Sequence, residues 1–369
     1  MPQMNKDDIA QISSKDQTLV IHCGKVYDVT KFVNVHPGGS KILSLRHGKD
    51  VTKIMENGPH THSKNAYRWL RQYYIADYCD TSESSDNHVT SNGTNGHIPS
   101  KSNGIKHVQQ NGIANTQEEE IVNWDEPMLW QVGHLGAKYH SWIDDPVDKT
   151  LRLFKSDFVE YFSNTPWYVI PIVWLPVIVL FLLRSFSMFS DSNVALSNLV
   201  SVASFSLSAS AMPVIFVLGM LLWSFLEYSL HRWLFHSDPP TTSYFLITLH
   251  FLLHGQHHKV PFDSGRLVFP PVASSVFLVI LYPMFRLVFS AAVTDSLVAG
   301  VLFGYVCYDM THYYLHYGAP RKGSYFDRLR AYHVRHHFES PHLGFGISSK
   351  LWDYPFNTLI RMAKKRSSE

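Results

Sequence analysis

The sequence predicts a small α+β domain followed by an all-α integral membrane domain with four transmembrane helices and a histidine-rich cap. Three observations lead to this prediction. Four long apolar runs follow Pro166, a polar stretch without Phe, Trp, Tyr, Leu or Met covers residues 81–123, and 12 histidines lie between His231 and His342. We therefore expect a domain at residues 1–80, a disordered linker at 81–123 and a membrane domain at 124–369.

The composition of the chain excludes several classes of protein. Only 17% of the 369 residues are charged, against roughly 25% in average soluble proteins, which favours a membrane protein. The net charge of +2 provides no basic field for nucleic acid. Three cysteines, Cys23, Cys79 and Cys307, cannot form a fully paired disulfide framework and include no C-x-x-C zinc motif.

From Thr18 to Tyr78 the chain has the composition of a small globular domain. TLVIHCGKVYDVTKFV predicts short strands with a turn at Gly24-Lys25, and SKNAYRWLRQYYIADY predicts an amphipathic helix capped by Ser63. The N-terminus has no basic segment followed by an apolar core, so we expect no signal peptide and a cytosolic N-terminus. A linker of about 40 residues spans on the order of 35 Å, which lets this domain reach another one without a fixed dock.

The apolar runs are each close to the ~20 residues that cross a bilayer. They comprise Trp167 to Leu183, Ser192 to Leu226, Leu267 to Phe285, and Leu287 to Tyr308, the last interrupted only by Asp295. Core helices of a large soluble domain are the alternative, but four such segments would leave too little polar surface. Two hairpins starting from a cytosolic N-terminus return the chain to the cytosol after the second and fourth runs, and histidines follow both exits.

The motif His36-Pro37-Gly38-Gly39 places an imidazole at a turn where two glycines permit the close approach of a flat cofactor. An ordinary loop histidine is the alternative. The string VYDVTKFVNVHPGGSKIL, followed by PHTHS, resembles the cytochrome b5 family over approximately residues 10–80. This resemblance implies that His36 and His62 are the axial ligands of a haem b, whereas sequence chemistry alone leaves His47 and His60 open. Two axial histidines leave no open position on the iron, so this haem would carry electrons.

Ten further histidines fall into four groups, HRWLFH, HGQHH, HYYLH and HVRHH. Spacings of three and four place side chains on one helix face, so each of the last three groups is expected to present its imidazoles in one direction. His231 and His236 are five residues apart, and we expect the helix to end between them. Ten imidazoles exceed the needs of one ion, which predicts two metal ions. We interpret the outlying His250 and His342 as structural.

The order of these groups, with four membrane segments, resembles the integral-membrane fatty acid hydroxylase superfamily. The fusion to a cytochrome b5-like domain and the string LHFLLHGQHHKVPFDSGRLVFPP narrow the resemblance to fatty acid 2-hydroxylases. The resemblance implies that all ten histidines are metal ligands: His231, His236, His254, His257, His258, His312, His316, His333, His336 and His337.

In that family a dimetal site, functionally iron, uses O2 and electrons delivered through the haem to hydroxylate a long-chain fatty acyl substrate next to its carboxyl carbon. The products are 2-hydroxy fatty acids for sphingolipids such as ceramides. The resemblance further implies an NAD(P)H-dependent cytochrome reductase as electron donor and the endoplasmic reticulum membrane as location, with both termini and the active site cytosolic. Zinc also accepts imidazole and is a second candidate for the metal of purified protein.

Two acidic residues are candidates for a supporting role at the metal site. Glu227 lies four residues before His231 and Asp309 three before His312, so either could accept the second ring N–H of a ligand. The alternative is that both only mark helix ends at the membrane interface. Tyr308, like the other aromatic residues near the exits, is expected to anchor the interface.

Three other functions remain compatible with these motifs. A sterol-modifying oxidase or a desaturase uses similar histidine clusters. A metal transporter with a redox-sensing domain would need metal-binding residues within the spans, whereas these clusters lie at or beyond the exits. A haem carrier tethered to the membrane, with structural zinc, is the third alternative.

Overall fold

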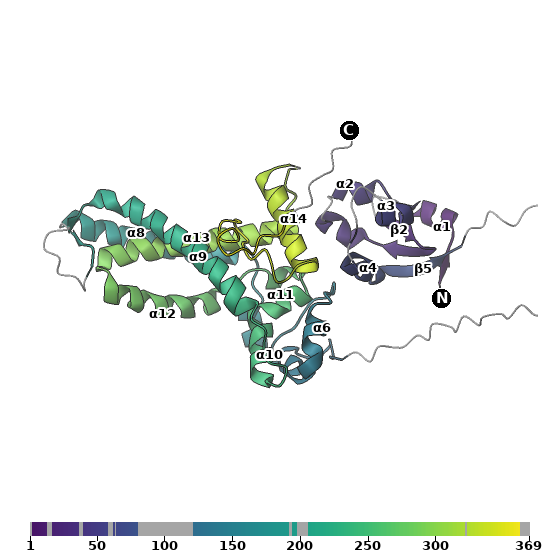
Figure 1. Cartoon of the computed structure of the whole chain (residues 1–369), viewed down its shortest axis with the longest axis horizontal. Helices are drawn as coiled ribbons and strands as arrows, with labels where there is room; N and C mark the ends of the chain where they lie inside the picture. Colours follow the sequence, from purple (N-terminus) through teal and green to yellow (C-terminus); the bar gives the residue numbers. More distant parts are fainter. Residues whose placement is uncertain are drawn as a thin grey trace, which may run out of the picture.

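The structure is a computed structural model that describes residues 2–12, 17–36, 40–57, 62, 64–79, 121–191, 194–197, 206–321 and 323–361. Most of the predicted linker, residues 81–120, lies outside the described residues. The molecule is elongated, with four long helices at one end, a cap of shorter helices in the middle and a mixed α/β domain at the other end (Figure 1).

The N-terminal domain is built on a five-stranded sheet in the order β1-β5-β3-β2-β4. Successive residues of a strand point to opposite faces; accordingly Leu19 and Ile21 of β2 enter one small core and Val20 enters another. The strands are β1 (Gln3–Met4), β2 (Leu19–His22), β3 (Lys25–Asp28), β4 (Lys49–Asp50) and β5 (Tyr74–Tyr78). The helices are α1 (Lys6–Gln11), the 3-10 helix η1 (Thr30–Val35), α2 (Ser40–Ser44), α3 (Thr52–Asn57) and α4 (Lys64–Arg71).

Two local predictions for this domain were wrong in detail. The hairpin turn is one residue earlier than expected, because His22 pairs with Lys25 and leaves Cys23 and Gly24 as the loop, both at positive φ. The predicted helix ends at Arg71, and the segment YIADY forms β5 between β1 and β3. The pairing of β5 with a strand on each edge, β1 and β3, outweighs the helical periodicity of this segment. The predicted helix cap, Ser63, lies outside the described residues.

Each of the four predicted apolar runs contains a long helix that satisfies the length and apolarity needed to cross a membrane, over Val169–Ser190, Ala209–Phe235, Ser264–Val288 and Ala291–Tyr317. The second run, predicted from Ser192, becomes helical only at Ala209, because its earlier described residues form two short strands. Within these spans lie α8 (Val169–Asp191), α9 (Met212–Ser229), α12 (Pro271–Val288) and α13 (Ala291–Tyr317). The fourth span is 78% buried, against 11–22% for the others. Helix α13 is therefore the centre of the bundle, and the other three turn apolar side chains outward, as helices in lipid do.

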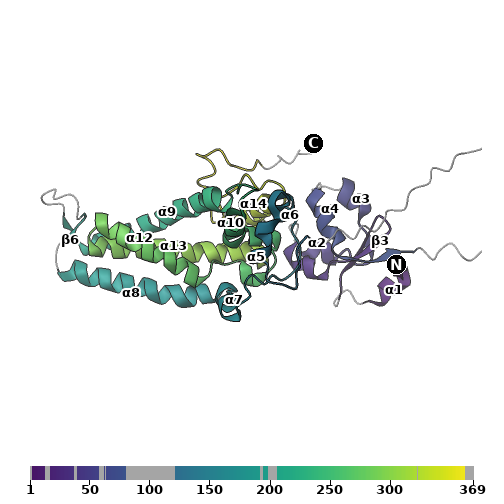
Figure 2. The same ribbon diagram turned by 90° about the horizontal axis from the view of Figure 1, so that it is seen from below.

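Close packing between α9 and α13 depends on two glycines. A Cβ added at Gly219 would lie 2.2 Å from the carbonyl oxygen of Leu297, and one at Gly300 would lie 2.0 Å from that of Phe216. Such contacts are impossible for any other residue, so these glycines allow the two backbones to meet as small residues do in membrane helix pairs. The short strands β6 (Val194–Ala195) and β7 (Ser206–Leu207) close the far end of the bundle (Figure 2).

The cap collects the segments between and beyond the spans at one end of the bundle (Figure 1). Its core packs Met128, Tyr139 and Leu153 against Ile247 and Phe251. The cap elements are α5 (Leu129–Val132), η3 (Gly133–Lys138), α6 (Tyr139–Ile143), α7 (Asp157–Ser163), the π-helices η5 (Leu230–Phe235) and η6 (Phe251–Gly255), α10 (Tyr244–His250), α11 (Gln256–Lys259), η7 (Ser264–Arg266) and α14 (Tyr325–Phe338), with η4 (Ala209–Ala211) preceding α9. Both even-numbered spans end in this cap, as the sequence predicted.

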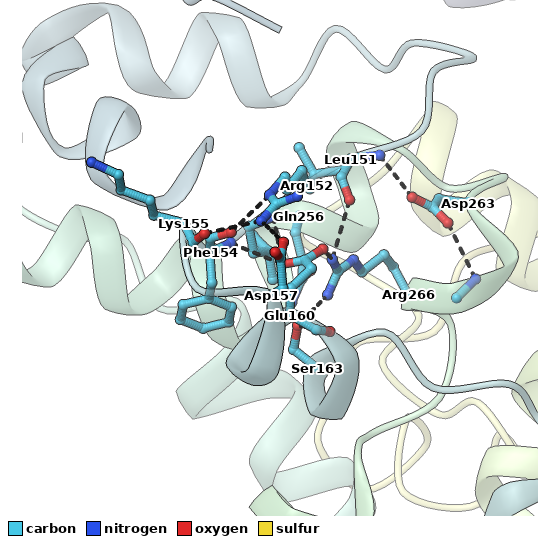
Figure 3. A network of polar contacts seen from close by, with 12 residues as sticks. Leu151, Arg152, Phe154, Lys155, Asp157, Glu160, Ser163, Gln256, Asp263 and Arg266 are labelled. Atoms are coloured by element: carbon cyan, nitrogen blue, oxygen red, sulfur yellow. Dashed lines mark hydrogen bonds and ion pairs between the residues drawn. The ribbon is translucent and has the colours of Figure 1, made fainter. Parts of the chain in front are cut away.

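A buried ion pair attaches α7 to the start of the third span (Figure 3). Arg266 donates to Glu160, to Ser163 Oγ at 2.9 Å and to the carbonyl oxygen of Leu151 at 3.1 Å. The other oxygen of Glu160 accepts the N–H groups of Leu153 at 3.1 Å and Phe154 at 2.8 Å. This network holds residues 151–154 beside the histidine-bearing helices.

Candidate metal centre

The ten clustered histidines come from the membrane exits and the cap helices. The helix that carries His231 and His236 does end between them, at Phe235, but only after its last turn widens into the π-helix η5. The backbone N–H of His236 bonds to the carbonyl oxygen of His231 at 3.0 Å, an i→i+5 bond that residues five apart make in a π-helix. His254 lies in a second π-helix, η6. Widened turns of this kind recur at functional sites because they re-aim side chains.

The histidines form two groups of five, which we call cluster A and cluster B. In each group one ring nitrogen per residue lies within 4.8 Å of all the others. Cluster A comprises His231, His236, His254, His258 and His336, and cluster B comprises His257, His312, His316, His333 and His337. The clusters adjoin, since the ring centroids of His258 and His337 are 4.4 Å apart.

The expectation that HGQHH and HVRHH each point in one direction was wrong. His254 and His258 belong to cluster A, and the intervening His257 belongs to cluster B. The HVRHH motif is divided in the same way, with His333 and His337 in cluster B and His336 in cluster A. Neighbouring residues on an α-helix project about 100° apart, so each adjacent pair of histidines serves two centres, while residues four apart share one.

The spacing of the ring nitrogens fits metal coordination. Nε2 atoms are paired at 3.2 Å between His231 and His254 and at 3.0 Å between His257 and His337. Two nitrogens about 2.1 Å from one ion lie about 3.0 Å apart at a right angle and about 3.4 Å apart at a tetrahedral angle. Both clusters therefore have the donor type and spacing that transition metals require.

Backbone carbonyls determine which ring nitrogen is free in three of these histidines. Nδ1 of His231, His312 and His336 donates to a carbonyl oxygen, at 2.6 Å to Phe345, 2.9 Å to Leu267 and 2.7 Å to Leu343, respectively. Their Nε2 atoms then carry lone pairs, and the Nε2 atoms of His231 and His312 face further ring nitrogens, of His254 and His257. A cation between the facing ring nitrogens would be bound by the lone pairs that these Nε2 atoms carry.

The two carboxylates predicted to hold the ligand rings do so only indirectly, because the ring N–H groups of His231 and His312 go to carbonyls. Glu227 accepts the backbone N–H groups of Ile347 at 3.1 Å and Ser348 at 2.7 Å. Asp309 accepts the N–H of Phe269 at 3.3 Å. Each carboxylate thus anchors the segment whose carbonyl bonds to the histidine ring, and the prediction of direct contact was wrong because the ring N–H groups bond to backbone carbonyls instead.

Asp353 is a further supporting residue that sequence reasoning missed. It is fully buried and accepts the N–H groups of Phe345 at 3.0 Å and Gly346 at 3.1 Å, and the hydroxyl of Thr358 at 2.8 Å. Residues 343–348, which supply two of the ring-holding carbonyls, are therefore clamped by Glu227 and Asp353 together. The partners of Asp353 lie within eight residues of it, but a lone Asp in a loop has no local signature of this supporting role.

Burial keeps the cap histidines neutral. Desolvation, followed by the mutual repulsion of neighbouring imidazoles, lowers the pKa values of His254, His257, His258 and His333 well below their ordinary value. It lowers the pKa of His336 to about 4. Neutral imidazole is the form that binds metals. The outlying His250 instead bonds through Nδ1 to the hydroxyl of Tyr139 at 2.6 Å, which supports its structural interpretation.

An apolar cavity of about 310 Å³ opens beside both clusters. Its walls include Phe154, Val272 and Val276, and its inner end includes His254 and His312. Tyr308, expected at the membrane interface, also lines this cavity and stacks on His312 with ring centroids 6.0 Å apart. The volume and lining are those of a small-molecule site with few polar groups, positioned to bring an apolar chain to the two histidine clusters.

The N-terminal domain offers a second cofactor site. Nδ1 of His62 lies 3.2 Å from the carbonyl oxygen of Met55, so it donates there and leaves Nε2 free for a metal. His36 is half-buried at the end of η1, with its ring edge-on to Phe32 at 5.7 Å between centroids. The chemistry of both imidazoles fits an axial haem ligand.

Comparisons with known proteins agree with both sites. Residues 5–79 match the family model described as cytochrome b5-like heme/steroid binding domain, and residues 216–358 match that of fatty acid hydroxylase. The chain is 46% identical over 338 residues to a Mus musculus protein named fatty acid 2-hydroxylase, covering 91% of this chain and 89% of that protein. The chain belongs to the fatty acid 2-hydroxylase family. The predicted family, fold class and enzyme class are thereby confirmed.

Comparisons with other fatty acid hydroxylases support the same family. A ceramide very long chain fatty acid hydroxylase from Saccharomyces cerevisiae is 31% identical over 363 residues, covering 91% of this chain and 88% of that protein. A solved structure of full-length scs7p, in which only the hydroxylase domain is visible, aligns with a TM-score of 0.56 at 31% identity, covering 65% of this chain and 86% of that one. The chain is thus a multi-pass membrane protein. Its cytochrome b5 domain implies haem and electron transfer, and its fatty acid hydroxylase domain implies a lipid substrate.

Proposed function

We propose that the chain hydroxylates the carbon next to the carboxyl carbon of a long fatty acyl chain, producing 2-hydroxy acyl groups for sphingolipids such as ceramides. The observation that carries the proposal is the placement of ten imidazoles, sorted into two groups of five, beside an apolar cavity that is lined by His254, His257 and His312. Acid–base side chains cannot break an unactivated C–H bond, so the two metal ions, with iron as the working metal, and O2 supply that chemistry.

The residues of the chain would bind the metal ions and orient the acyl chain. Clusters A and B would each hold one ion, and the carbonyls of Phe345 and Leu267 keep their ligands in the tautomer that binds it. The walls of the cavity hold the acyl chain, and the distance from the mouth to the histidines selects the carbon that is presented. Buried, neutral imidazoles exclude water from the site.

The N-terminal domain, residues 1–80, would act as the electron donor to the membrane domain, residues 124–369, through the linker at 81–123. His36 and His62 would hold its haem, and two axial imidazoles restrict that haem to electron transfer. An NAD(P)H-dependent cytochrome reductase would supply the electrons. Because the even-numbered spans both end in the cap, the site and both termini would lie on one side, which we propose is the cytosolic face of the endoplasmic reticulum.

Mass spectrometry of total lipids tests this function. Cells without a hydroxylase of their own are made to express the chain or its His257→Ala variant, which lacks one ligand of cluster B. We expect 2-hydroxy acyl chains in sphingolipids only with the intact chain, and loss of metal together with loss of product in the variant. Product from both chains would overturn the metal-site assignment. Unchanged sphingolipids with altered sterols would instead identify a sterol oxidase.

A further inference from the structure

The N-terminal domain lies directly against the cap, on the side away from the membrane helices (Figures 1 and 2). Three hydrogen bonds join the turn after α4 to residues 146–148. The amide of Gln72 donates to the carbonyl oxygen of Pro146 at 3.0 Å and accepts the N–H of Asp148 at 3.0 Å. The hydroxyl of Tyr73 donates to the Asp148 carboxylate at 3.2 Å.

Aromatic rings form the apolar part of the same contact. Phe262, in the loop after α11, packs on Trp69 with ring centroids 5.1 Å apart and on Phe32 at 6.2 Å. Trp69 also meets Phe338, the last residue of α14, at 5.6 Å. Trp69 is only 4% exposed. Phe262 of the cap is thus seated among aromatic rings of the N-terminal domain. In this contact the N-terminal domain has one orientation relative to the cap.

These rings connect the two cofactor sites. The ring of His36 contacts Phe32 at 5.7 Å, Phe32 contacts Phe262 at 6.2 Å, and Phe262 contacts His316 at 6.4 Å between centroids. His36 is the proposed haem ligand and His316 belongs to cluster B. The rings of Phe32 and Phe262, in contact with each other, therefore connect His36 of the proposed haem site with His316 of cluster B.

We infer that this contact is the electron-transfer complex of the chain, and that Phe262 is a positioning residue that couples the haem to cluster B. The inference rests on the proposed function. In the step, the haem held by His36 and His62 would pass one electron to the metal ions held by the clusters, so that the ferrous haem would become ferric and the oxidised metal pair would be reduced by one. No bond forms or breaks and no proton moves. A cavity of about 230 Å³ beside Tyr73 and Phe262 leaves the contact incompletely packed, as in interfaces that open and close.

Cysteine trapping tests the docking independently of activity. In a full-length chain whose own cysteines are replaced by serine and whose linker carries a protease site, Gln72→Cys is combined with Asp148→Cys. After oxidation and linker cleavage, we expect most molecules to stay joined until reduced. The matched control pairs Asp148→Cys with Lys6→Cys, an exposed residue of α1 at the far end of the domain, and should separate. Equal joining in both pairs, or none, would overturn the docking.

Haem spectroscopy on the trapped, iron-loaded chain tests the role of Phe262. After a light pulse reduces the haem without oxygen, we expect its reoxidation to remain at least as fast as in the untrapped chain. Phe262→Leu should slow it severalfold in the trapped chain, where the domains cannot separate, whereas Phe326→Leu on α14 should not. A trapped chain whose haem stays reduced would overturn the inference. Normal reoxidation without any hydroxylated lipid would instead overturn the proposed function and leave the docking intact.

Discussion

Replacing Asp353 with Ala is expected to release the metal of cluster A selectively. The carboxylate accepts two buried N–H groups, of Phe345 and Gly346, and the Thr358 hydroxyl. Leaving a buried donor unsatisfied costs about 1–3 kcal/mol, so two of them cost about 2–6 kcal/mol if the loop stays in place. We expect the loop to move instead, which removes the carbonyl of Phe345 from His231 and that of Leu343 from His336.

Both of those histidines belong to cluster A. Loss of such indirect support typically lowers metal affinity about 10–100-fold. Cluster B, whose His312 is held by Leu267, should keep its ion.

The assay is elemental mass spectrometry of metal per chain during titration with a chelator. The intact chain should lose metal in two steps, and Asp353→Ala should shift only one step to lower chelator concentration. Asp353→Asn, which retains one acceptor oxygen, should shift it less, and replacement of the exposed Asp238 should not shift it. Movement of both steps together, or of neither, would refute the assignment of this loop to cluster A.

Four further outcomes are expected. His36→Ala and His62→Ala should each abolish the haem Soret band while leaving the metal content unchanged, and a band that survives both changes would refute the haem ligands. Deleting a few residues within 85–115 should leave product formation nearly unchanged, since the remaining linker still spans the docked domains; a sharp loss would show that the linker has an ordered role. Folding lowers the pKa of His336 to about 4, so unfolding of the metal-free chain takes up a proton below pH 6.5. The contribution of each such histidine to the unfolding free energy should be constant above that pH and fall by about 1.4 kcal/mol per pH unit down to about pH 4, and an unchanged urea midpoint of the metal-free chain at pH 5.5 would contradict this. Glu160→Ala leaves the guanidinium of Arg266 buried without its counter-ion and should lower the unfolding free energy by about 3–5 kcal/mol, more than Glu160→Gln does, as thermal unfolding in detergent would measure.

Local sequence patterns were sufficient to predict much of the fold and most residues of the candidate site. The four apolar runs predicted the four long helices because crossing a membrane imposes a length and an apolarity on consecutive residues. The histidine spacings identified the residues that the structure gathers into two clusters. In each case the signal lies within a few residues of chain, which a single sequence records.

The tertiary structure decided how those residues are used. Whether His257 joins His258 or His337 depends on which helices flank α11, and no spacing within HGQHH specifies that. The contact of His231 with the carbonyl of Phe345, in place of the predicted carboxylate, and the seating of Phe262 among rings of the N-terminal domain each join residues more than a hundred positions apart. The clamp by Asp353 acts on the loop that makes the first of these contacts. Periodicity encodes which face of a helix a side chain occupies, whereas the partner on that face is set only when distant segments pack.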